Sequence, residues 1–390
     1  MMKVLAAIGI LGLAFTFPVF SQDVPDTAQK PFVKGGIYDK PYLIRPSGRL
    51  AVGGYAEMLV RSDYEAGIHE GYSFEARRFN IFLFSSVSDL IKLTSELEFE
   101  HGTEEIKLEM ALVDLQFREE FNLRGGILLS PVGKFNLAHD SPRNEFVDRP
   151  LVSTRVIPAT LSEAGLGFYG SFYPSGENRV TYESYLVNGL TDGILLAGDG
   201  TSLPDGRPEA FEEDNNGSPA FVGRLAFSPH FGGELGFSIH SGRYNTYKLE
   251  GVEVDEPRTA TLLALDAEYE IGRLSLQGEL ARVSIAIPPS LVGLFAEKQW
   301  GFYGQALYNL FDGILPMFPQ SVLAVGSRYD YIDFDADIEG ADLHRVTLGV
   351  NLRPVPETVL RFNYLHNWEF DRINNETRSA ALQFGIATYF

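Results

Sequence analysis

Residues 90–101 read "LIKLTSELEFEH", and apolar and polar side chains alternate along them with a period of two. One row is mostly apolar and consists of Ile91, Leu93, Ser95, Leu97 and Phe99. The intervening row is polar and consists of Lys92, Thr94, Glu96, Glu98 and Glu100. Successive side chains of a β-strand point to opposite faces, whereas helical spacing does not produce this pattern. The stretch therefore predicts a strand between an apolar medium and a polar one.

The same alternation recurs in about sixteen segments of roughly 10 residues each, which is the length of a tilted membrane-spanning strand. Their predicted starts are Leu50, Phe74, Leu90, Ile106, Phe121, Ala164, Arg179, Ala220, Gly233, Thr259, Arg273, Gln299, Ser321, Asp342, Glu357 and Thr377.

The connections between these segments differ in length at the two ends. After even-numbered strands they are mostly short, as at 174–178, 228–233, 271–273 and 353–357. After odd-numbered strands they are mostly long and polar, as at 131–163, 189–219, 241–258, 284–298 and 367–376. Two connections depart from this rule. The one at 101–105 is short although it follows an odd-numbered strand, and the one at 311–320 is long although it follows an even-numbered strand. This asymmetry predicts an all-β fold, a transmembrane antiparallel β-barrel of about 16 strands with short periplasmic turns and long extracellular loops.

The chain ends on another alternating stretch, "ALQFGIATYF", whose last residue is Phe390. A barrel in hydrocarbon tolerates no open edge, so the last strand has to pair with the first. We expect Leu382, Phe384, Ile386 and Phe390 to face lipid. An aromatic C-terminal residue resembles the signal that the barrel-assembly machinery reads in outer-membrane proteins. The alternative is the edge strand of an ordinary β-sandwich.

The N-terminus has the pattern of an export signal. Lys3 precedes an apolar run at 4–17, and a small-residue cleavage pattern ends at Ser21. The run is short for a membrane anchor, which needs about 20 residues. We predict a signal peptide at 1–21, a periplasmic lead at 22–48 and the barrel at 49–390.

Composition excludes several classes of function. The formal net charge of −20 argues against a nucleic-acid partner, because phosphate binding requires a basic surface. The absence of cysteine excludes disulfides and thiolate chemistry. None of the seven histidines has the spacing of a metal-ligand pair, so no metal and no cofactor are predicted. His139 and Ser141 suggest an outer-membrane hydrolase, but no orienting partner is evident, and an enzyme is not predicted.

The connection at 131–163 is the longest, and it interleaves apolar residues with charges of both signs. Such a segment can pack against a barrel wall while its charges remain hydrated. We therefore expect it to fold inward and narrow the pore. The candidate constriction residues are Lys134, His139, Asp140, Arg143, Arg149 and Arg155.

The polar rows of the strands provide a second set of candidates, which are expected to face the lumen. These are Arg78, Glu96, Glu98, Glu268, Glu279, Arg345 and Arg361.

Several motifs resemble the porin superfamily that contains the phosphate-selective porins O and P. They are "GGYAEM" from Gly53, "FEARRFNIFLFSSV" from Phe74, "TSELEFEH" from Thr94, "LRGGILLSPVGKFN" from Leu123, and "DRP" followed by "VIPATLSEAGLGFYG". The resemblance implies a sixteen-stranded, trimeric porin with a folded-in third loop. The chain has 32 Lys and Arg against 52 Asp and Glu, so no phosphate-binding residue of that family is transferred.

We therefore expect a porin of the outer membrane of a Gram-negative bacterium that allows passive diffusion of small hydrophilic solutes or ions. Its expected partners are outer-membrane lipid, lipopolysaccharide, the barrel-assembly machinery through Phe390, and two further copies of itself in a homotrimer. A phospholipase-like hydrolase and a structural or adhesive barrel are the alternatives.

Overall fold

The structure is a computed structural model that describes residues 36–37, 39–40, 50–195, 200–208, 211–230 and 232–390. The chain divides into two units, residues 1–30 and residues 31–390. The predicted signal peptide at 1–21 lies outside the described residues. So does the predicted lead at 22–48, apart from residues 36, 37, 39 and 40.

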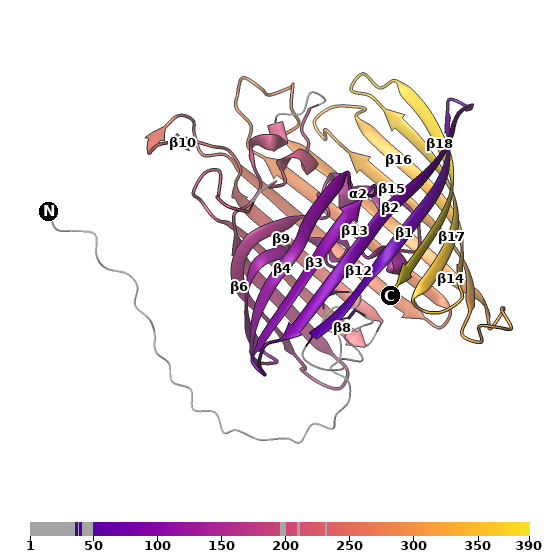
Figure 1. The fold of residues 1–390 in the computed structure, drawn as a ribbon. Coiled ribbons are helices and arrows are strands. Elements are labelled where there is room, and N and C mark those ends of the chain that lie inside the picture. Colours follow the sequence, from indigo (N-terminus) through magenta and orange to yellow (C-terminus); the bar gives the residue numbers. More distant parts are fainter. Residues whose placement is uncertain (1–35, 38, 41–49, 196–199, 209–210, 231) are drawn as a thin grey trace. The chain divides into compact units, whose positions relative to one another are not determined.

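Sixteen antiparallel strands close into one barrel, which confirms the predicted fold class (Figure 1). They are β1 (Leu50–Glu65), β2 (Ile68–Ser86), β3 (Ile91–Glu100), β4 (Glu105–Arg118), β5 (Phe121–Leu129), β6 (Ser162–Phe172), β7 (Arg179–Val187), β8 (Ala220–His230), β9 (Gly233–Arg243), β12 (Thr259–Ile271), β13 (Leu274–Ile285), β14 (Lys298–Asp312), β15 (Val322–Asp333), β16 (Asp342–Arg353), β17 (Thr358–Phe370) and β18 (Glu376–Tyr389). The predicted starts agree within one or two residues, except that β2 begins at Ile68 rather than Phe74.

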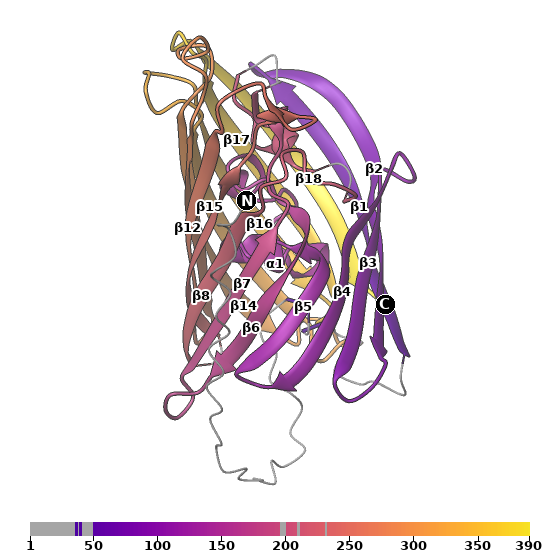
Figure 2. The ribbon, with the colours of Figure 1, turned by 90° about the vertical axis from the view of Figure 1, so that its left-hand side faces the viewer.

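The remaining elements are short and lie in the connections. They are α1 (Gly133–Leu137), η1 (Ser141–Arg143), α2 (Leu151–Arg155), η2 (Asp192–Leu195), η3 (Pro204–Gly206), and a separate hairpin of β10 (Lys248–Leu249) and β11 (Val252–Glu253). In the part of the chain that the structure describes, no helix is long and apolar enough to span a membrane. Figure 2 shows α1 inside the ring of strands.

The two ends of the barrel pair to close it. β1 and β18 run antiparallel from Tyr55 opposite Tyr389 to Glu65 opposite Ser379. Phe390 extends this ladder, because its N–H donates to the carbonyl of Gly54 at 3.0 Å. The Phe390 ring is 58% exposed on the outer surface and stacks on Phe79 with 5.6 Å between centroids. A Cβ on Gly54 would collide with this ring and with the Asn80 carbonyl, so glycine is required there.

The outer surface carries the apolar rows. Leu382, Phe384 and Ile386 are exposed, whereas Gln383 and Gly385 between them are buried inside the ring. Exposed apolar residues recur on the outward positions of the neighbouring strands, as at Leu348, Val350 and Phe362. A band of this kind is stable where the surrounding medium is hydrocarbon.

Leu348 lies near the middle of β16 and is 50% exposed, so it tests the lipid-facing surface. We expect Leu348→Arg to lower the free energy of unfolding in lipid by about 2–4 kcal/mol, because the charge enters hydrocarbon. The matched control is Ile338→Arg, an exposed apolar residue in the connection after β15, which should change stability by less than about 0.5 kcal/mol. Equal effects in a reversible urea titration would show that Leu348 does not face lipid.

The inner surface is divided into an apolar part and a charged part. Inward positions of β7, β8, β12 and β13, including Val187, Val222, Leu262 and Val283, belong to one buried apolar cluster. Residues of the connection 130–161 complete this cluster. Inward positions of β15 to β18 and of β1 to β3 carry many charged and amide side chains, among them Glu57, Arg328 and Arg361. Water therefore does not fill the whole lumen, because the apolar part of the inner wall packs against the connection and forms a buried core.

Candidate pore constriction

The connection 130–161 enters the barrel immediately after β5. Gly133, at the start of α1, has a φ of 68° and donates its N–H to Ser238 Oγ on β9 at 2.8 Å. A side chain at position 133 would overlap the Glu279 carboxylate and Ile157, so the "SPVG" motif requires glycine here. The Asn136 side chain donates to the carbonyls of Ser130 and Leu161, which holds the two ends of the connection together.

The middle of the connection is bound to the charged part of the wall. Arg361 on β17 donates from Nη1 to the carbonyls of Ser141, Asn144 and Phe146 at 3.1, 3.1 and 3.2 Å. Its Nη2 pairs with Glu57 on β1 at 2.9 Å, and Ser141 Oγ donates to the same carboxylate at 2.6 Å. This segment is thus fixed on β17 and β1, away from β5, where the connection enters the barrel.

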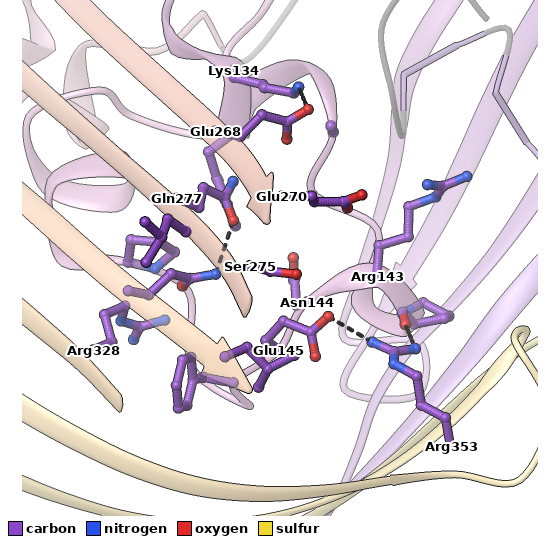
Figure 3. A pocket seen from close by; sticks show the side chains of 18 of the residues that line it. Lys134, Arg143, Asn144, Glu145, Glu268, Glu270, Ser275, Gln277, Arg328 and Arg353 are labelled. Atoms are coloured by element: carbon purple, nitrogen blue, oxygen red, sulfur yellow. Dashed lines mark hydrogen bonds and ion pairs between the residues drawn. The ribbon is translucent and has the colours of Figure 1, made fainter. Parts of the chain in front are cut away.

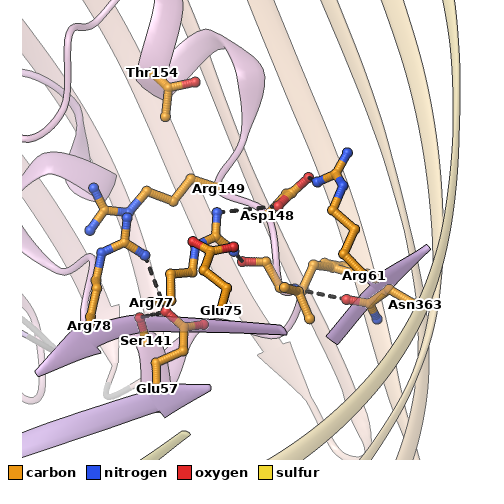
Figure 4. Close-up of polar contacts among 12 residues, drawn as sticks. Glu57, Arg61, Glu75, Arg77, Arg78, Ser141, Asp148, Arg149, Thr154 and Asn363 are labelled. Atoms are coloured by element: carbon orange, nitrogen blue, oxygen red, sulfur yellow. Dashed lines mark hydrogen bonds and ion pairs between the residues drawn. The ribbon is translucent and has the colours of Figure 1, made fainter. Parts of the chain in front are cut away.

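Asp148 lies among three arginines from three strands, and Figure 4 shows two of them, Arg61 and Arg77. Its carboxylate is 3.3 Å from Arg61 Nη1, 3.3 Å from Arg77 Nη2 and 3.8 Å from Arg345 Nη1. Burial raises the pKa of Asp148, but the charges of Arg77, Arg345 and Arg61 outweigh it, so the pKa lies below its usual range. The carboxylate therefore remains ionised, and these pairs persist, as the pH falls through the ordinary titration range of aspartate.

The connection then continues through α2 (Leu151–Arg155), which packs against β13, β14 and β15. The N–H of Leu151 donates to Asp330 on β15 at 2.9 Å, and Ser153 Oγ donates to Glu279 on β13 at 2.7 Å. Leu151, Val152 and Val156 are buried in the apolar cluster. Apolar burial and polar anchoring thus fix the same short helix.

Two β-bulges alter which side chains face the lumen. Glu57 pairs with Arg78 and Met58 pairs with Ala76, so Arg77 is an extra residue of β2. Arg77 contacts Asp148 while its neighbour Arg78 pairs with Glu57, so consecutive arginines both point inward. Glu109 is likewise extra in β4 and is buried beside the inward Met110. Strict alternation could not identify Arg77 or Glu109.

The six predicted constriction residues have different environments. Lys134 is buried and pairs with Glu268 at 2.6 Å and Glu234 at 3.4 Å. Arg143 remains partly exposed and pairs with Asp39 at 2.9 Å. Arg155 is exposed at the end of α2.

The other three lie deeper. His139 is buried against Glu109 at 3.3 Å, and Asp140 is buried and accepts hydrogen bonds from Lys40 and Tyr389. Arg149 is partly buried, and within the described residues its Nε and Nη2 have no hydrogen-bond partner.

The seven residues predicted to face the lumen all contact groups inside the ring. Arg78 pairs with Glu98 at 3.3 Å and with Glu100 at 2.8 Å. Glu96 and Glu279 are buried, the latter beneath α1 and α2. The contacts of Glu268, Arg345 and Arg361 are those given above.

His139 and Ser141 do not form a nucleophile–base pair. The imidazole Nε2 is 3.3 Å from Glu109, and Ser141 Oγ donates to Glu57 instead. Glu96, His139 and Asp140 offer ligand atoms within 4.8 Å of one another, but the ammonium of Lys40 already binds both oxygens of Asp140.

A cavity of about 540 Å³ borders the connection (Figure 3). Charges of both signs line it, with Arg353 paired to Glu145 at 3.2 Å and Lys134 paired to Glu268. Amides line another part, where Gln305 donates to Gln277 at 2.8 Å. A space with mixed charges and amides is suited to hydrated solutes.

The barrel resembles outer-membrane porins and channels of known structure. An anion-selective porin from Comamonas acidovorans superposes with a TM-score of 0.56 at 14% identity, over 87% of this chain and 99% of that chain. OmpF of Salmonella typhi gives 0.55 at 12% identity, over 87% and 98%. The channel DcaP of Acinetobacter baumannii gives 0.54 at 10% identity, over 87% and 97%. At these identities the likeness establishes a shared fold, the closed barrel of outer-membrane porins.

In sequence, an uncharacterized protein of Aquifex aeolicus (strain VF5) is 26% identical over 384 residues, which cover 91% of this chain and 84% of that protein. No protein-family model matches the chain.

Proposed function

We propose that this protein is a porin of the porin superfamily, located in the outer membrane of a Gram-negative bacterium, through which small hydrophilic solutes or ions diffuse passively. The observation that carries the proposal is the connection 130–161, which crosses the lumen and holds Asp148 among Arg61, Arg77 and Arg345. An internal segment with charges of both signs narrows a channel without sealing it. Charges at such close quarters are poorly screened and bias which ions pass.

The arrangement favours weak selectivity over a tight anion trap. Arg61, Arg77 and Arg345 are balanced by Asp148, and Arg61 and Arg77 also approach Asp63 and Glu75. Arginine-rich walls with matching carboxylates do not create a uniformly positive well. Phosphate is therefore not the proposed substrate.

The remaining expectations form part of the same proposal. Export through a signal peptide at 1–21, contact with lipid and lipopolysaccharide, and reading of Phe390 by the barrel-assembly machinery are consistent with an outer-membrane barrel. A homotrimer is supported by one similar structure, the trimer form of OmpT of Vibrio cholerae, which superposes with a TM-score of 0.55 at 10% identity.

The proposal is tested by planar-bilayer recordings of the refolded protein. We expect discrete ion currents with weak selectivity, and Asp148→Asn should shift the reversal potential towards anions, because three arginines lose their counter-charge. Asp337→Asn, which removes an exposed acid paired with Lys298 at 2.9 Å, is the matched control and should shift nothing. A protein that conducts no ions, or strong anion selectivity with block by dilute phosphate, would contradict the proposal.

A further inference from the structure

Lys40 is a buried lysine that does not belong to the barrel wall. It precedes β1 in the chain, yet its side chain is only 3% exposed. Its ammonium donates to both carboxylate oxygens of Asp140 in the connection 130–161. The same ammonium lies 4.3 Å from the centroid of the Phe82 ring on β2.

Further groups complete the surroundings of this ammonium. Tyr389 on β18 donates its hydroxyl to Asp140 Oδ2 at 2.7 Å, which orients that carboxylate. Glu96 is 0% exposed, and its Oε1 accepts from Asn80 at 2.7 Å. Within the described part of the chain, Glu96 Oε2 has no hydrogen-bond partner. One oxygen of Glu96 lies within 4.8 Å of the ligand atoms of Asp140 and His139.

This set of groups has the chemistry of an ammonium site. Carboxylates attract the positive charge and accept its N–H bonds, and the face of an aromatic ring adds a cation–π contact. Asp140 binds the Lys40 ammonium, and an oxygen of Glu96 lies within 4.8 Å of an Asp140 oxygen, so an amine that displaced Lys40 would meet the same acceptors. A buried carboxylate oxygen without a donor is costly, and an N–H donor placed there would recover that cost.

A second ion pair holds the segment that carries Lys40, and in this pair the acid lies on the segment and the base lies on the connection 130–161. Asp39, the neighbour of Lys40, accepts a hydrogen bond from Arg143 Nη2 through its backbone oxygen at 2.6 Å and pairs with the same group at 2.9 Å. Arg143 and Tyr389 also line the 540 Å³ cavity. Residues 39 and 40 therefore dock on the connection 130–161 beside the space through which solutes are proposed to pass.

We propose that Glu96, Asp140, Tyr389 and Phe82 form an ammonium-binding pocket, that Lys40 fills it as a tethered ligand, and that primary amines of solutes compete for it. The inference rests on the proposed channel function only for its physiological meaning, because the pocket itself is defined by the contacts above. A tethered ligand competes at an effective concentration of about millimolar, so a free amine binds the intact protein weakly.

The test is calorimetric titration of the refolded protein in detergent with n-butylammonium. Lys40→Ala, which removes the side chain that fills the pocket, should bind the amine about tenfold more tightly than the wild type, because the competitor is gone. Adding Asp140→Asn to Lys40→Ala should abolish this gain. Tetramethylammonium, which has no N–H donor, should bind both Lys40 variants weakly.

Controls separate the pocket from general charge effects. Lys298→Met removes an exposed lysine elsewhere and should leave amine binding at the wild-type level. Lys40→Gly serves as a second variant if Lys40→Ala does not refold. Equal amine affinity in the wild type and in the Lys40 variant, or undiminished binding after Asp140→Asn, would overturn the inference.

Bilayer recordings distinguish this inference from the proposed function. A conducting Lys40 variant whose current butylammonium reduces supports both. Conduction without any amine binding by calorimetry overturns only the pocket. Amine binding by a protein that carries no current supports the pocket and overturns the channel.

Discussion

Deleting residues 138–149 is expected to raise single-channel conductance several-fold and to weaken ion selectivity. The deleted segment includes Asp148, Glu145 and the backbone carbonyls that Arg361 binds, so it accounts for most of the contacts with the charged wall. Asn136, which ties the ends of the connection together, is retained. Because α1 packs against α2, the two sides of the deletion can be rejoined by a short link.

The matched control for this deletion removes residues 248–253, which form the exposed β10–β11 hairpin. We expect the control to leave conductance and reversal potential unchanged. Both proteins should retain the strand content of the wild type by circular dichroism, because the barrel ladder is intact. If the 138–149 deletion refolds and conducts as the wild type does, the connection does not form the constriction.

Replacing Arg361 by Met is expected to lower the free energy of unfolding by about 3–5 kcal/mol, because it leaves Glu57 with one partner fewer at a buried site. Arg361 is 0% exposed and is hydrogen-bonded to three carbonyls of the connection. Those carbonyls lose their donor in the same substitution. Reversible urea unfolding in lipid measures the effect.

Arg273→Met is the matched control, because Arg273 pairs with Asp312 at 2.7 Å where both side chains are largely exposed. It should cost less than about 1 kcal/mol. Combining Arg361→Met with Glu57→Gln should recover part of the loss, since the buried carboxylate that lost Arg361 is then neutral. An Arg361 variant as stable as the Arg273 variant would show that the anchor does not stabilise the barrel.

The strands were predictable because their signal is local. A side chain alternates between hydrocarbon and lumen every residue, so stretches such as residues 90–101 record the two environments directly. Both unusual connections that the sequence indicated are present, as the tight turn at 101–104 and the long one at 313–321. The same locality explains the one clear displacement, because β2 begins at Ile68 in a stretch where the alternation is weak.

The candidate site was only partly predictable, because its contacts join residues far apart in the chain. Asp148 lay in the expected connection but was not singled out, and its partners Arg61, Arg77 and Arg345 come from β1, β2 and β16. Arg61 belongs to the inward row of β1, so the alternation could have predicted its orientation. The alternation could not have predicted Arg77, because a bulge turns its side chain inward.

By itself, the sequence determined the closed antiparallel barrel, the number of strands and the apolar outer band, since period-two alternation is a property of each strand alone. Only the tertiary structure decided that β7, β8, β12 and β13 bury an apolar core inside the lumen, and that Lys40 lies against Asp140. Burial and ion pairing depend on which distant segments meet. The path of the connection 130–161 through the barrel determines which distant residues come into contact, and no local sequence pattern predicts that path.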